Sequence, residues 1–435
     1  MKIAIIGAGI AGLGAAYLLS RRHEVSVFEA QPRLGGHTHT HAIEVAGERH
    51  SIDPGFIVFN ADHYPLLTRL FGELGVESLP TTMSFSVRNE ASGLEYNATD
   101  VERLFCQRRN LLRPAFWRMV REILRFYRQA PALLSEPGPG PTIGEYLRAG
   151  GYGPLFVHDH LVPMASALWS SPSATVLDFP AKYLVQFMAN HQMLDPGTRK
   201  PWRVVKGGSA RYLDKLLPAT RAQFRTGAPV RGVRRHPDRV DLVLDGDTLR
   251  FDQVVFACHA DQALALLDDA SAAEREVLGA FGFQPNDTVL HTDVRLLPRN
   301  PRARAAWNAL RLQAVDDRGS SPAPSAGTAG TSRHAPTPAC TVSYSMNLLQ
   351  GIRSATQFIV TLNATARIDP ARILARMNYS HPVYTHASVA AQARWAQISG
   401  VHRSHWCGAY WGWGFHEDGL RSGVRVAAAL GCDWA

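Results

Sequence analysis

A glycine-rich segment at residues 7–12 limits the possible folds of this chain more than any other part of the sequence. It reads GAGIAG, follows an apolar run at residues 2–6, and precedes a helical pattern at residues 13–20. Residues 24–28 (EVSVF) then have the pattern of a second strand. A G-x-G-x-x-G segment between a strand and a helix is typical of dinucleotide-binding folds. Its glycines permit a tight turn, close approach of a pyrophosphate, and close helix–strand packing. The order predicts a βαβ unit in a parallel sheet.

Glu29 stands at the end of the second predicted strand. A carboxylate there accepts hydrogen bonds from a ribose 2′-hydroxyl and repels a 2′-phosphate, which favours FAD or NAD over NADP. The start of the following helix supplies backbone N–H groups for the phosphates. The fingerprint and its neighbours therefore place these residues in the cofactor site: Gly7, Gly9, Ile10, Ala11, Gly12, Glu29 and Ala30.

Composition excludes several classes of protein. The chain has 435 residues, of which 46% are hydrophobic and 19% charged, as in ordinary globular proteins. Its five cysteines are odd in number and form no C-x-x-C pair, so we expect no disulfide framework, no metal site and a cytoplasmic protein. The apolar run at residues 3–19 contains the glycine fingerprint and is therefore interpreted as strand and helix, not as a signal peptide.

Several further motifs resemble those of the FAD-dependent amine oxidase, phytoene desaturase and protoporphyrinogen oxidase superfamily. QPRLGG at 31–36 resembles the R-x-G-G segment that follows the acidic residue in that superfamily, and nicotinamide dehydrogenases lack this segment. The other resembling segments are DPGF at 53–56, KGG at 206–208, APV at 228–230, CGA at 407–409 and GFHEDGLRSG at 414–423.

The resemblance implies an α/β protein with a Rossmann-type, amine-oxidase-like FAD-binding domain and a substrate domain of mixed sheet and helices. It implies FAD-binding segments at 1–65, 201–285 and 401–435, a helical substrate region at 66–200, and further substrate domain at 286–400. FAD would be non-covalent, because no cysteine lies at residues 377–384. The resemblance adds these cofactor-site residues: Arg33, Gly35, Gly36, His37, Asp53, Gly55, Phe56, Val230, Ala257, Gly408, Ala409, Asp418, Gly419, Leu420 and Ser422.

Three residues are candidates for a catalytic role. Phe415 occupies the place where related amine oxidases hold the amine with a tyrosine, and Trp413 belongs to the same aromatic stretch, YWGWGFH. Lys206 precedes the Gly-Gly turn and is a candidate for a place beside the flavin. The alternatives are core packing for the aromatic residues, a surface loop for Lys206, and capping of the following helix by Asp418.

Residues 101–130 form a strongly basic region with a net charge of +6, against +9 for the whole chain. The spacing predicts a helix whose arginine stripe, at 118, 121, 125 and 128, lies opposite an apolar stripe at 116, 120, 123 and 127. Such a helix suits the anionic inner surface of a membrane. The alternative is an ordinary amphipathic helix with solvated arginines. No nucleic-acid-binding motif accompanies it.

The pattern is similar to a bacterial branch that includes desaturases of methyl-branched fatty-acyl chains. That resemblance implies hydride transfer from an apolar lipid substrate to flavin, with an unidentified electron acceptor. The alternatives are a flavin amine oxidase, a redox-neutral double-bond isomerase, and a non-enzymatic FAD-binding module. Residues 316–338 are rich in Ser, Pro, Ala, Gly and Thr, and we expect a mobile loop there.

Overall fold

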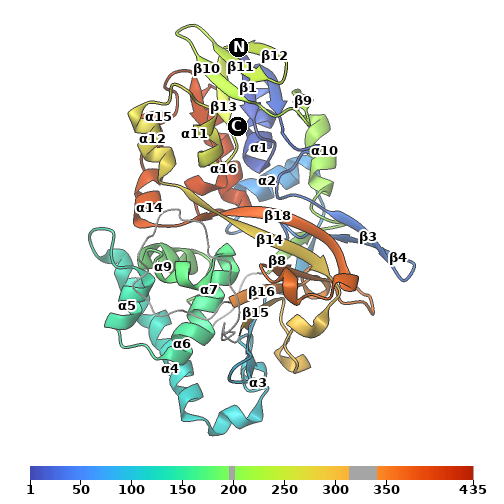
Figure 1. Cartoon of the computed structure of the whole chain (residues 1–435), viewed down its shortest axis with the longest axis vertical. Helices are drawn as coiled ribbons and strands as arrows, with labels where there is room; N and C mark the ends of the chain where they lie inside the picture. The colour runs from blue at the N-terminus through green and yellow to red at the C-terminus, as the bar shows by residue number, and fades with distance from the viewer. Residues whose placement is uncertain (195–200, 313–339, 435) are drawn as a thin grey trace, which may run out of the picture.

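The chain folds into two halves joined along its longest axis (Figure 1). The computed structural model describes residues 1–194, 201–312 and 340–434. The half that carries the N-terminus is built on a parallel sheet and is called the parallel-sheet half here. The other half combines a larger mixed sheet with a group of helices and is called the mixed-sheet half. The predicted loop at 316–338 lies outside the described residues.

The parallel sheet has the strand order β19-β13-β1-β2-β9, and every neighbouring pair runs in the same direction. Its strands are β1 (Lys2–Ile6), β2 (Glu24–Phe28), β9 (Gln223–Arg225), β13 (Gln253–Phe256) and β19 (Ser404–Trp406). Ile3 to Ile6 and Val25 to Phe28 are fully buried because helices and a meander cover the sheet. This burial explains why these strands read as continuous apolar runs.

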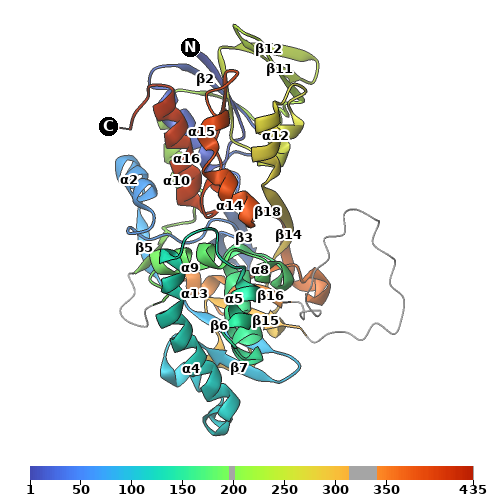
Figure 2. The ribbon, with the colours of Figure 1, turned by 90° about the vertical axis from the view of Figure 1, so that its left-hand side faces the viewer.

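Helix α1 (Ile10–Leu19) follows β1 directly and packs closely against α16 (His416–Ala429). The other elements of this half are α2 (Pro65–Leu74), α10 (Arg211–Ala219), α11 (Ala260–Ala265), α12 (Ala272–Gly279), α14 (His386–Gln392), α15 (Trp395–Ile398), and the meander β10 (Gly232–Arg235), β11 (Val240–Leu244) and β12 (Asp247–Phe251). Figure 2 shows α16 and α12 on opposite sides of this half. Because α16 packs on α1, the C-terminal helix lies next to the N-terminal glycine fingerprint.

The mixed sheet has the order β18-β14-β17-β16-β15-β6-β7, antiparallel except between β15 and β6. Its strands are β6 (Phe85–Asn89), β7 (Leu94–Asn97), β14 (Gly282–His291), β15 (Trp307–Arg311), β16 (Cys340–Ser345), β17 (Ile359–Leu362) and β18 (Ile373–Val383). The long strands β14 and β18 cross from one half to the other (Figure 1). Two small ribbons pair β3 (His41–Val45) with β4 (Glu48–Ile52), and β5 (Ser78–Thr81) with β8 (Trp202–Val205).

Helices complete the mixed-sheet half. They are α3 (Val101–Leu104), α4 (Pro114–Gln129), α5 (Ile143–Ala149), α6 (Pro154–Phe156), α7 (Val162–Trp169), α8 (Ser173–Leu177), α9 (Ala181–Asn190) and α13 (Met346–Leu349). A π-helical turn, η3 (Val157–Leu161), links α6 to α7. The short 3-10 turns are η1 (Arg108–Leu112), η2 (Ala130–Ser135), η4 (Val294–Leu296), η5 (Pro301–Ala303), η6 (Thr365–Arg367), η7 (Pro370–Arg372) and η8 (Ala409–Trp411).

The predicted α/β fold class, the βαβ opening and the C-terminal helix are confirmed. Helix α2 is short, because Pro65 starts it and Gly75 ends it in the left-handed region at φ 62°. The basic region at 101–130 is not one helix, since α3 and the 3-10 turn η1 precede Pro114, which starts α4 afresh. Among the described residues, no helix is both long and apolar enough to cross a bilayer.

Candidate functional site

A cavity of about 1050 Å³ extends from the parallel sheet into the mixed-sheet half. At one end it is lined by the turn after β1, the end of β2 and the start of α16. At the other end it is lined by α7, α9, β18 and the start of β6. Ligands of doubly wound folds bind at the carboxyl ends of the parallel strands, where the first end of this cavity lies.

The fingerprint forms a turn that only glycine can build. Gly7 adopts φ +107°, and a Cβ at Gly12 would lie 2.0 Å from the Gly7 carbonyl oxygen. A Cβ at Gly9 would meet no protein atom within 4 Å, because Gly9 faces the cavity. Helix α1 begins at Ile10 with no side-chain cap, so its first N–H groups are available to a bound phosphate.

Glu29 lies at the cavity wall directly after β2. Its carboxylate accepts hydrogen bonds from the backbone N–H groups of Ala8 and Gln31, each at 2.9 Å. These two bonds fix the carboxylate beside the glycine turn. Each carboxylate oxygen has further acceptor capacity, which a ribose hydroxyl can use. The position is the one that the sequence predicts for nucleotide recognition.

The segment after Glu29 returns to the glycine turn. The Gly35 N–H donates to the Ala8 carbonyl oxygen at 2.8 Å, and Gly35 has φ +112°. A Cβ on Gly36 would stand 3.0 Å from the Gly9 Cα. The guanidinium of Arg33 donates to the Thr38 carbonyl oxygen at 3.3 Å and lines the cavity. The two glycines therefore keep a second stretch of backbone close to the first.

Helix α16 contributes the last wall of this end. Phe415 is its N-cap, and Asp418 accepts the Phe415 N–H at 3.1 Å, so Asp418 caps the helix as the alternative interpretation predicts. The Gly408 N–H donates to the Ser422 Oγ at 2.8 Å, which holds the backbone that follows β19 against the helix. Glu417 accepts the N–H groups of Leu66 and Leu67 at 3.1 and 3.0 Å and ties α16 to α2.

Most predicted cofactor-site residues come together in the structure. Those that line the cavity are Gly7, Gly9, Ile10, Ala11, Glu29, Ala30, Arg33, Gly36, His37, Gly55, Phe56, Val230, Ala257, Gly408, Ala409 and Gly419. Gly12, Gly35, Asp418, Leu420 and Ser422 lie outside its lining and shape the backbone that does line it. Leu420, for example, packs into the space beside Gly14 on α1.

Asp53 does not face the cavity, which corrects its prediction as a cofactor contact. It is fully buried and accepts hydrogen bonds from the Ser209 N–H at 2.9 Å, Thr40 Oγ1 at 2.5 Å and Gln350 Nε2 at 2.8 Å. Burial raises the pKa of Asp53, while these donors oppose the rise. The carboxylate joins three distant segments and so positions the neighbouring Gly55 and Phe56.

Two of the three predicted catalytic residues also lie elsewhere. The Lys206 ammonium pairs with Glu77 at 2.6 Å, both side chains are exposed, and Lys206 is not part of the cavity lining. Trp413 packs behind the wall, where its carbonyl oxygen accepts the indole N–H of Trp169 at 3.0 Å. Phe415 does line the cavity and stacks on Phe187 at a centroid distance of 5.1 Å.

Seven histidines line the cavity, and most of them were not predicted: His37, His39, His160, His191, His259, His381 and His416. Burial lowers the pKa of each, to about 4 for His39, His160, His191 and His381 and to about 3 for His416. They are therefore neutral at pH 7. The alternating His37-x-His39-x-His41 was a visible signal for part of this group.

His416 shows how firmly these rings are held. Its ring stacks on Phe56 at 3.8 Å, and its Nε2 lies 3.1 Å from both Thr38 Oγ1 and the Tyr212 hydroxyl. His381 Nδ1 accepts from the Asn286 amide at 3.0 Å, which places the proton of the neutral ring on Nε2. Within the described residues, no group of three His, Cys, Asp or Glu side chains could hold a metal ion.

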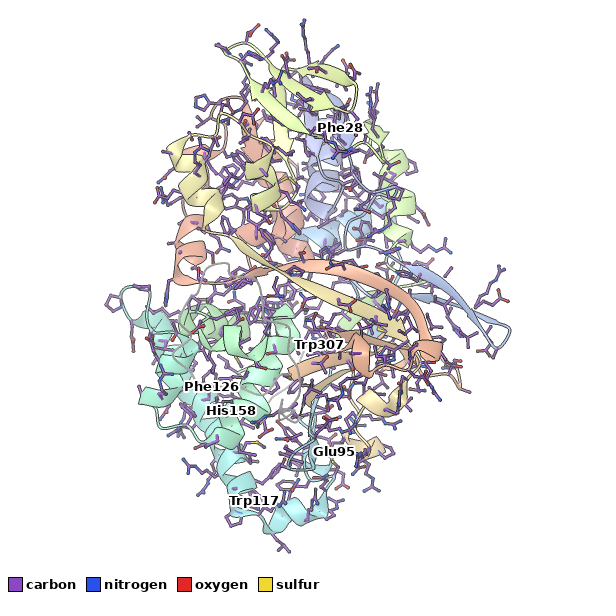
Figure 3. All side chains as sticks on the ribbon, in the orientation of Figure 1. Phe28, Glu95, Trp117, Phe126, His158 and Trp307 are labelled. Atoms are coloured by element: carbon purple, nitrogen blue, oxygen red, sulfur yellow. The ribbon has the colours of Figure 1, made fainter. Side chains whose placement is uncertain are left out.

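The part of the cavity within the mixed-sheet half is apolar. Among its lining residues are Met83, Phe85, Met164, Leu168, Trp169, Phe187, Trp307, Tyr344 and Leu362. Figure 3 places Trp307 in the interior of this half, between the sheet and the helices. Within the described residues, Glu29, Arg33 and Arg376 are the only acidic or permanently basic side chains in the whole lining. A carboxylate is therefore present only at the nucleotide end.

The residues at the nucleotide end fit a dinucleotide. Gly9 leaves open space at a helix N-terminus, Glu29 offers acceptor oxygens, and backbone from the distant Val230 and Gly408 closes the same end. Phosphate groups suit the uncapped N–H groups of α1, and a ribose suits Glu29. The remaining cavity continues into the apolar part, so a second molecule can lie beside the cofactor.

Comparison with known proteins gives the same assignment. The family model of flavin containing amine oxidoreductases matches residues 10–333. A carotenoid phi-ring synthase from Chlorobaculum tepidum is 40% identical over 78 residues, which are 18% of this chain and only 12% of that protein.

Two solved structures cover nearly the whole chain. Cyclohexylamine oxidase from Brevibacterium oxydans IH-35A superposes with a TM-score of 0.65 at 16% identity, covering 99% of this chain and 98% of that one. The CLA-producing fatty acid isomerase from P. acnes gives 0.65 at 14% identity, covering 100% and 98%. Likenesses at this level show the fold, and the fold alone does not select a substrate.

Proposed function

This chain belongs to the flavin containing amine oxidoreductase family, and from that premise we propose that it removes hydride from an apolar fatty-acyl substrate. As a member of the family it is an FAD-dependent oxidoreductase. The proposed reaction is desaturation of a methyl-branched unsaturated acyl chain. The hydride leaves one carbon, a proton leaves its neighbour, and a conjugated diene results. The two electrons then pass to an external acceptor such as oxygen or a quinone.

The apolar, carboxylate-free part of the cavity is the observation that carries this proposal. Met83, Met164, Leu168 and Phe187 offer hydrocarbon and aromatic surface without a charge. Burying an acyl chain against such surface is favourable by about 25 cal/mol per Å². A cationic substrate would lose its hydration there without gaining a carboxylate partner. An uncharged chain therefore fits this part of the cavity better than a cation.

Bound FAD would supply a two-electron acceptor for the hydride. The chain's own contribution is to bind and orient the substrate and to exclude water. Phe415 and Phe187 stack on one another beside the junction of the two parts of the cavity, where they can hold a chain against the cofactor. Neutral histidines give this junction hydrogen-bonding groups without a fixed charge.

A cationic amine is supported less well. The hydroxyl that a tyrosine would provide is absent at Phe415, and no carboxylate among the described lining residues lies in the apolar part. A redox-neutral isomerase would use the same apolar part, and the fold is shared by an amine oxidase and by a fatty acid isomerase. These two alternatives are therefore outcomes of the experiment below.

The test is the anaerobic absorbance spectrum of the purified holoenzyme before and after addition of phospholipids that carry methyl-branched unsaturated chains. Loss of the oxidised-flavin band supports the desaturase. Bleaching by amines and not by lipid would overturn the proposal in favour of an amine oxidase. A shifted double bond in the recovered lipid, with the flavin unchanged, would instead indicate an isomerase.

A variant that narrows the apolar part makes the test specific. Met164→Trp adds volume at a lining position and should slow reduction by lipid at least tenfold while the protein retains FAD. Leu348→Trp makes a similar change at an exposed position outside the lining and serves as the control. Equal reduction rates in the two variants would contradict the assignment of the apolar part to the substrate.

A further inference from the structure

An exposed group of apolar and basic side chains covers the outer face of residues 101–128. Half of the large hydrophobic residues that are exposed in the described chain lie here, with Leu112 at 88%, Val101 at 73% and Leu124 at 53% of full exposure. The docking surface, as we call it, consists of Val101, Leu111, Leu112, Trp117 and Leu124 together with the exposed arginines 103, 108, 109, 113, 118, 121 and 128.

The docking surface includes the end of the molecule farthest from the parallel sheet. Figure 3 shows Trp117 at this lower end, and Figure 2 shows α4 running down to it. The other face of α4 is buried, with Phe116, Met119 and Phe126 in the core of the mixed-sheet half. The helix is therefore held by its inner face. On its outer face Trp117 touches the Phe105 ring at 4.9 Å but stays 43% exposed, and Leu124 stays 53% exposed.

Positive charge dominates this surface. Arg103, Arg108 and Arg118 pair with acidic neighbours in their own segment. Arg113, Arg121 and Arg128 form no ion pair within the described residues. The predicted arginine stripe is changed at one position, because Arg125 lies over the Tyr152 ring at 3.9 Å and is only half-exposed. The three unpaired guanidinium groups are free to meet anions.

We propose that the docking surface binds the face of an anionic lipid bilayer. Exposed leucine and tryptophan side chains next to arginines match the two layers of such a face, which are acyl chains and negatively charged headgroups. A nucleic acid would use the arginines but would leave Leu112, Val101 and Leu124 in water. The apolar half of the surface therefore favours lipid.

The cavity reaches the surface of the protein next to the docking surface. Thr99 lines the cavity and is itself exposed, two residues before Val101. Tyr127 lines the same cavity from the last turn of α4. An acyl chain can therefore pass from a bilayer into the apolar part beside Thr99. This part of the inference rests on the proposed function, whereas membrane binding does not.

The experiment is co-sedimentation of the holoenzyme with vesicles of phosphatidylcholine, with and without phosphatidylglycerol. We expect binding to the anionic vesicles that weakens as salt is added. The triple variant Arg113→Gln, Arg121→Gln, Arg128→Gln should bind them about 100-fold more weakly, because each arginine near an anionic surface contributes about fivefold. Leu112→Asn should weaken binding about tenfold with little dependence on salt.

A matched control removes the same charge from the other half. Arg221→Gln, Arg234→Gln and Arg250→Gln change exposed arginines that also lack ion pairs in the described chain. This variant should bind vesicles as the wild type does. Equal losses in the two triple variants, or no vesicle binding by the wild type, would overturn the proposal. Binding of single-stranded RNA without binding of vesicles would overturn it as well.

Failure of the proposed function can be recognised separately. The docking triple variant should still be reduced by detergent-solubilised substrate, while its reduction by vesicle-embedded substrate falls in proportion to binding. If solubilised substrate does not reduce the wild type, the proposed function fails and vesicle binding can still stand. If the triple variant is reduced equally well from vesicles and from detergent, the docking surface does not deliver the substrate and that part is overturned.

Discussion

Gly423→Ala tests whether the close contact of α1 and α16 holds the cofactor site together. A Cβ at Gly423 would lie 2.3 Å from the Ala11 carbonyl oxygen and 3.0 Å from the Ala15 nitrogen. Non-bonded heavy atoms prefer roughly 3.5 Å, so the two helices must separate by about 1 Å. Both contacts are with backbone atoms, which cannot move away by rotation of a side chain. Overpacking of this kind costs up to about 3 kcal/mol, while alanine gains about 1 kcal/mol over glycine in a helix.

We therefore expect Gly423→Ala to lower the free energy of unfolding by about 2 kcal/mol. Two further glycines give a matched series. At Gly14 the new Cβ would meet the Leu420 Cδ1 at 2.5 Å, and this side-chain end can move. At Gly279, in α12, it would meet nothing within 4 Å. The thermal midpoints of the holoenzymes should rank Gly279→Ala first, Gly14→Ala second and Gly423→Ala last.

The same change should loosen the cofactor. Ala11 lines the cavity in the first turn of α1, and Gly419, one turn before Gly423, lines it from α16. Separation of the helices moves both walls, so Gly423→Ala should weaken FAD binding while Gly279→Ala leaves it unchanged. Titration of the apoproteins with FAD, followed by flavin fluorescence, measures this. The reasoning would be refuted if the Gly423→Ala and Gly279→Ala proteins had the same thermal midpoint and bound FAD with the same affinity.

Three further predictions concern carboxylates. Glu29→Gln should weaken FAD binding roughly tenfold to a hundredfold, measured by the same titration, because a charged acceptor is lost. Glu274→Gln should cost about 1–3 kcal/mol in chemical unfolding at pH 7, because the buried Arg235 guanidinium loses one of its two carboxylate partners and keeps only Asp269. Burial alone would raise the pKa of Glu274, but bonds from Arg235 hold it below 4.5, so this penalty is present at neutral pH and shrinks as the pH falls below that value. Burial raises the pKa of Asp418 to about 6. The folded state therefore loses stability as the pH rises from about 4 to 6 and this carboxyl group ionises. Asp418→Asn should remove that part of the pH dependence of the thermal midpoint.

The candidate site was predictable where its residues are neighbours in the chain. Gly7, Gly9, Gly12 and Glu29 belong to one βαβ unit, whose strand and helix periods are visible over short windows. The basic helix was predictable for the same reason, but its buried face was not. Of the predicted apolar stripe only Phe116 is buried, and Met119, Glu122 and Phe126 complete the face that α4 turns inward. The resemblance to known FAD enzymes added the segments near Val230 and Gly408. These segments line the same cavity, although their own sequence patterns do not predict a cofactor contact.

Residue roles that depend on partners far along the chain were not predictable in this way. Asp53 shares the D-x-G segment of related proteins, yet its oxygens are taken by Ser209 and Gln350, each more than 150 residues away. Lys206 precedes the Gly-Gly turn as expected, but its ammonium meets Glu77 at the surface. Motif position gave the place of the backbone correctly, whereas packing decided which way each side chain faces.

The nucleotide end of the site is encoded in one short stretch of sequence, since a strand, a glycine turn, a helix and an acidic residue must follow one another to build it. The substrate half depends on contacts between distant segments. Strands β14 and β18 pair although residues 292–372 separate them, and together with α7 and α9 they bring His381, Met164 and Phe187 around one cavity. The hydrophobic periodicity of a single segment does not predict this arrangement, because the arrangement arises from burial of apolar surface between segments that are distant in the chain.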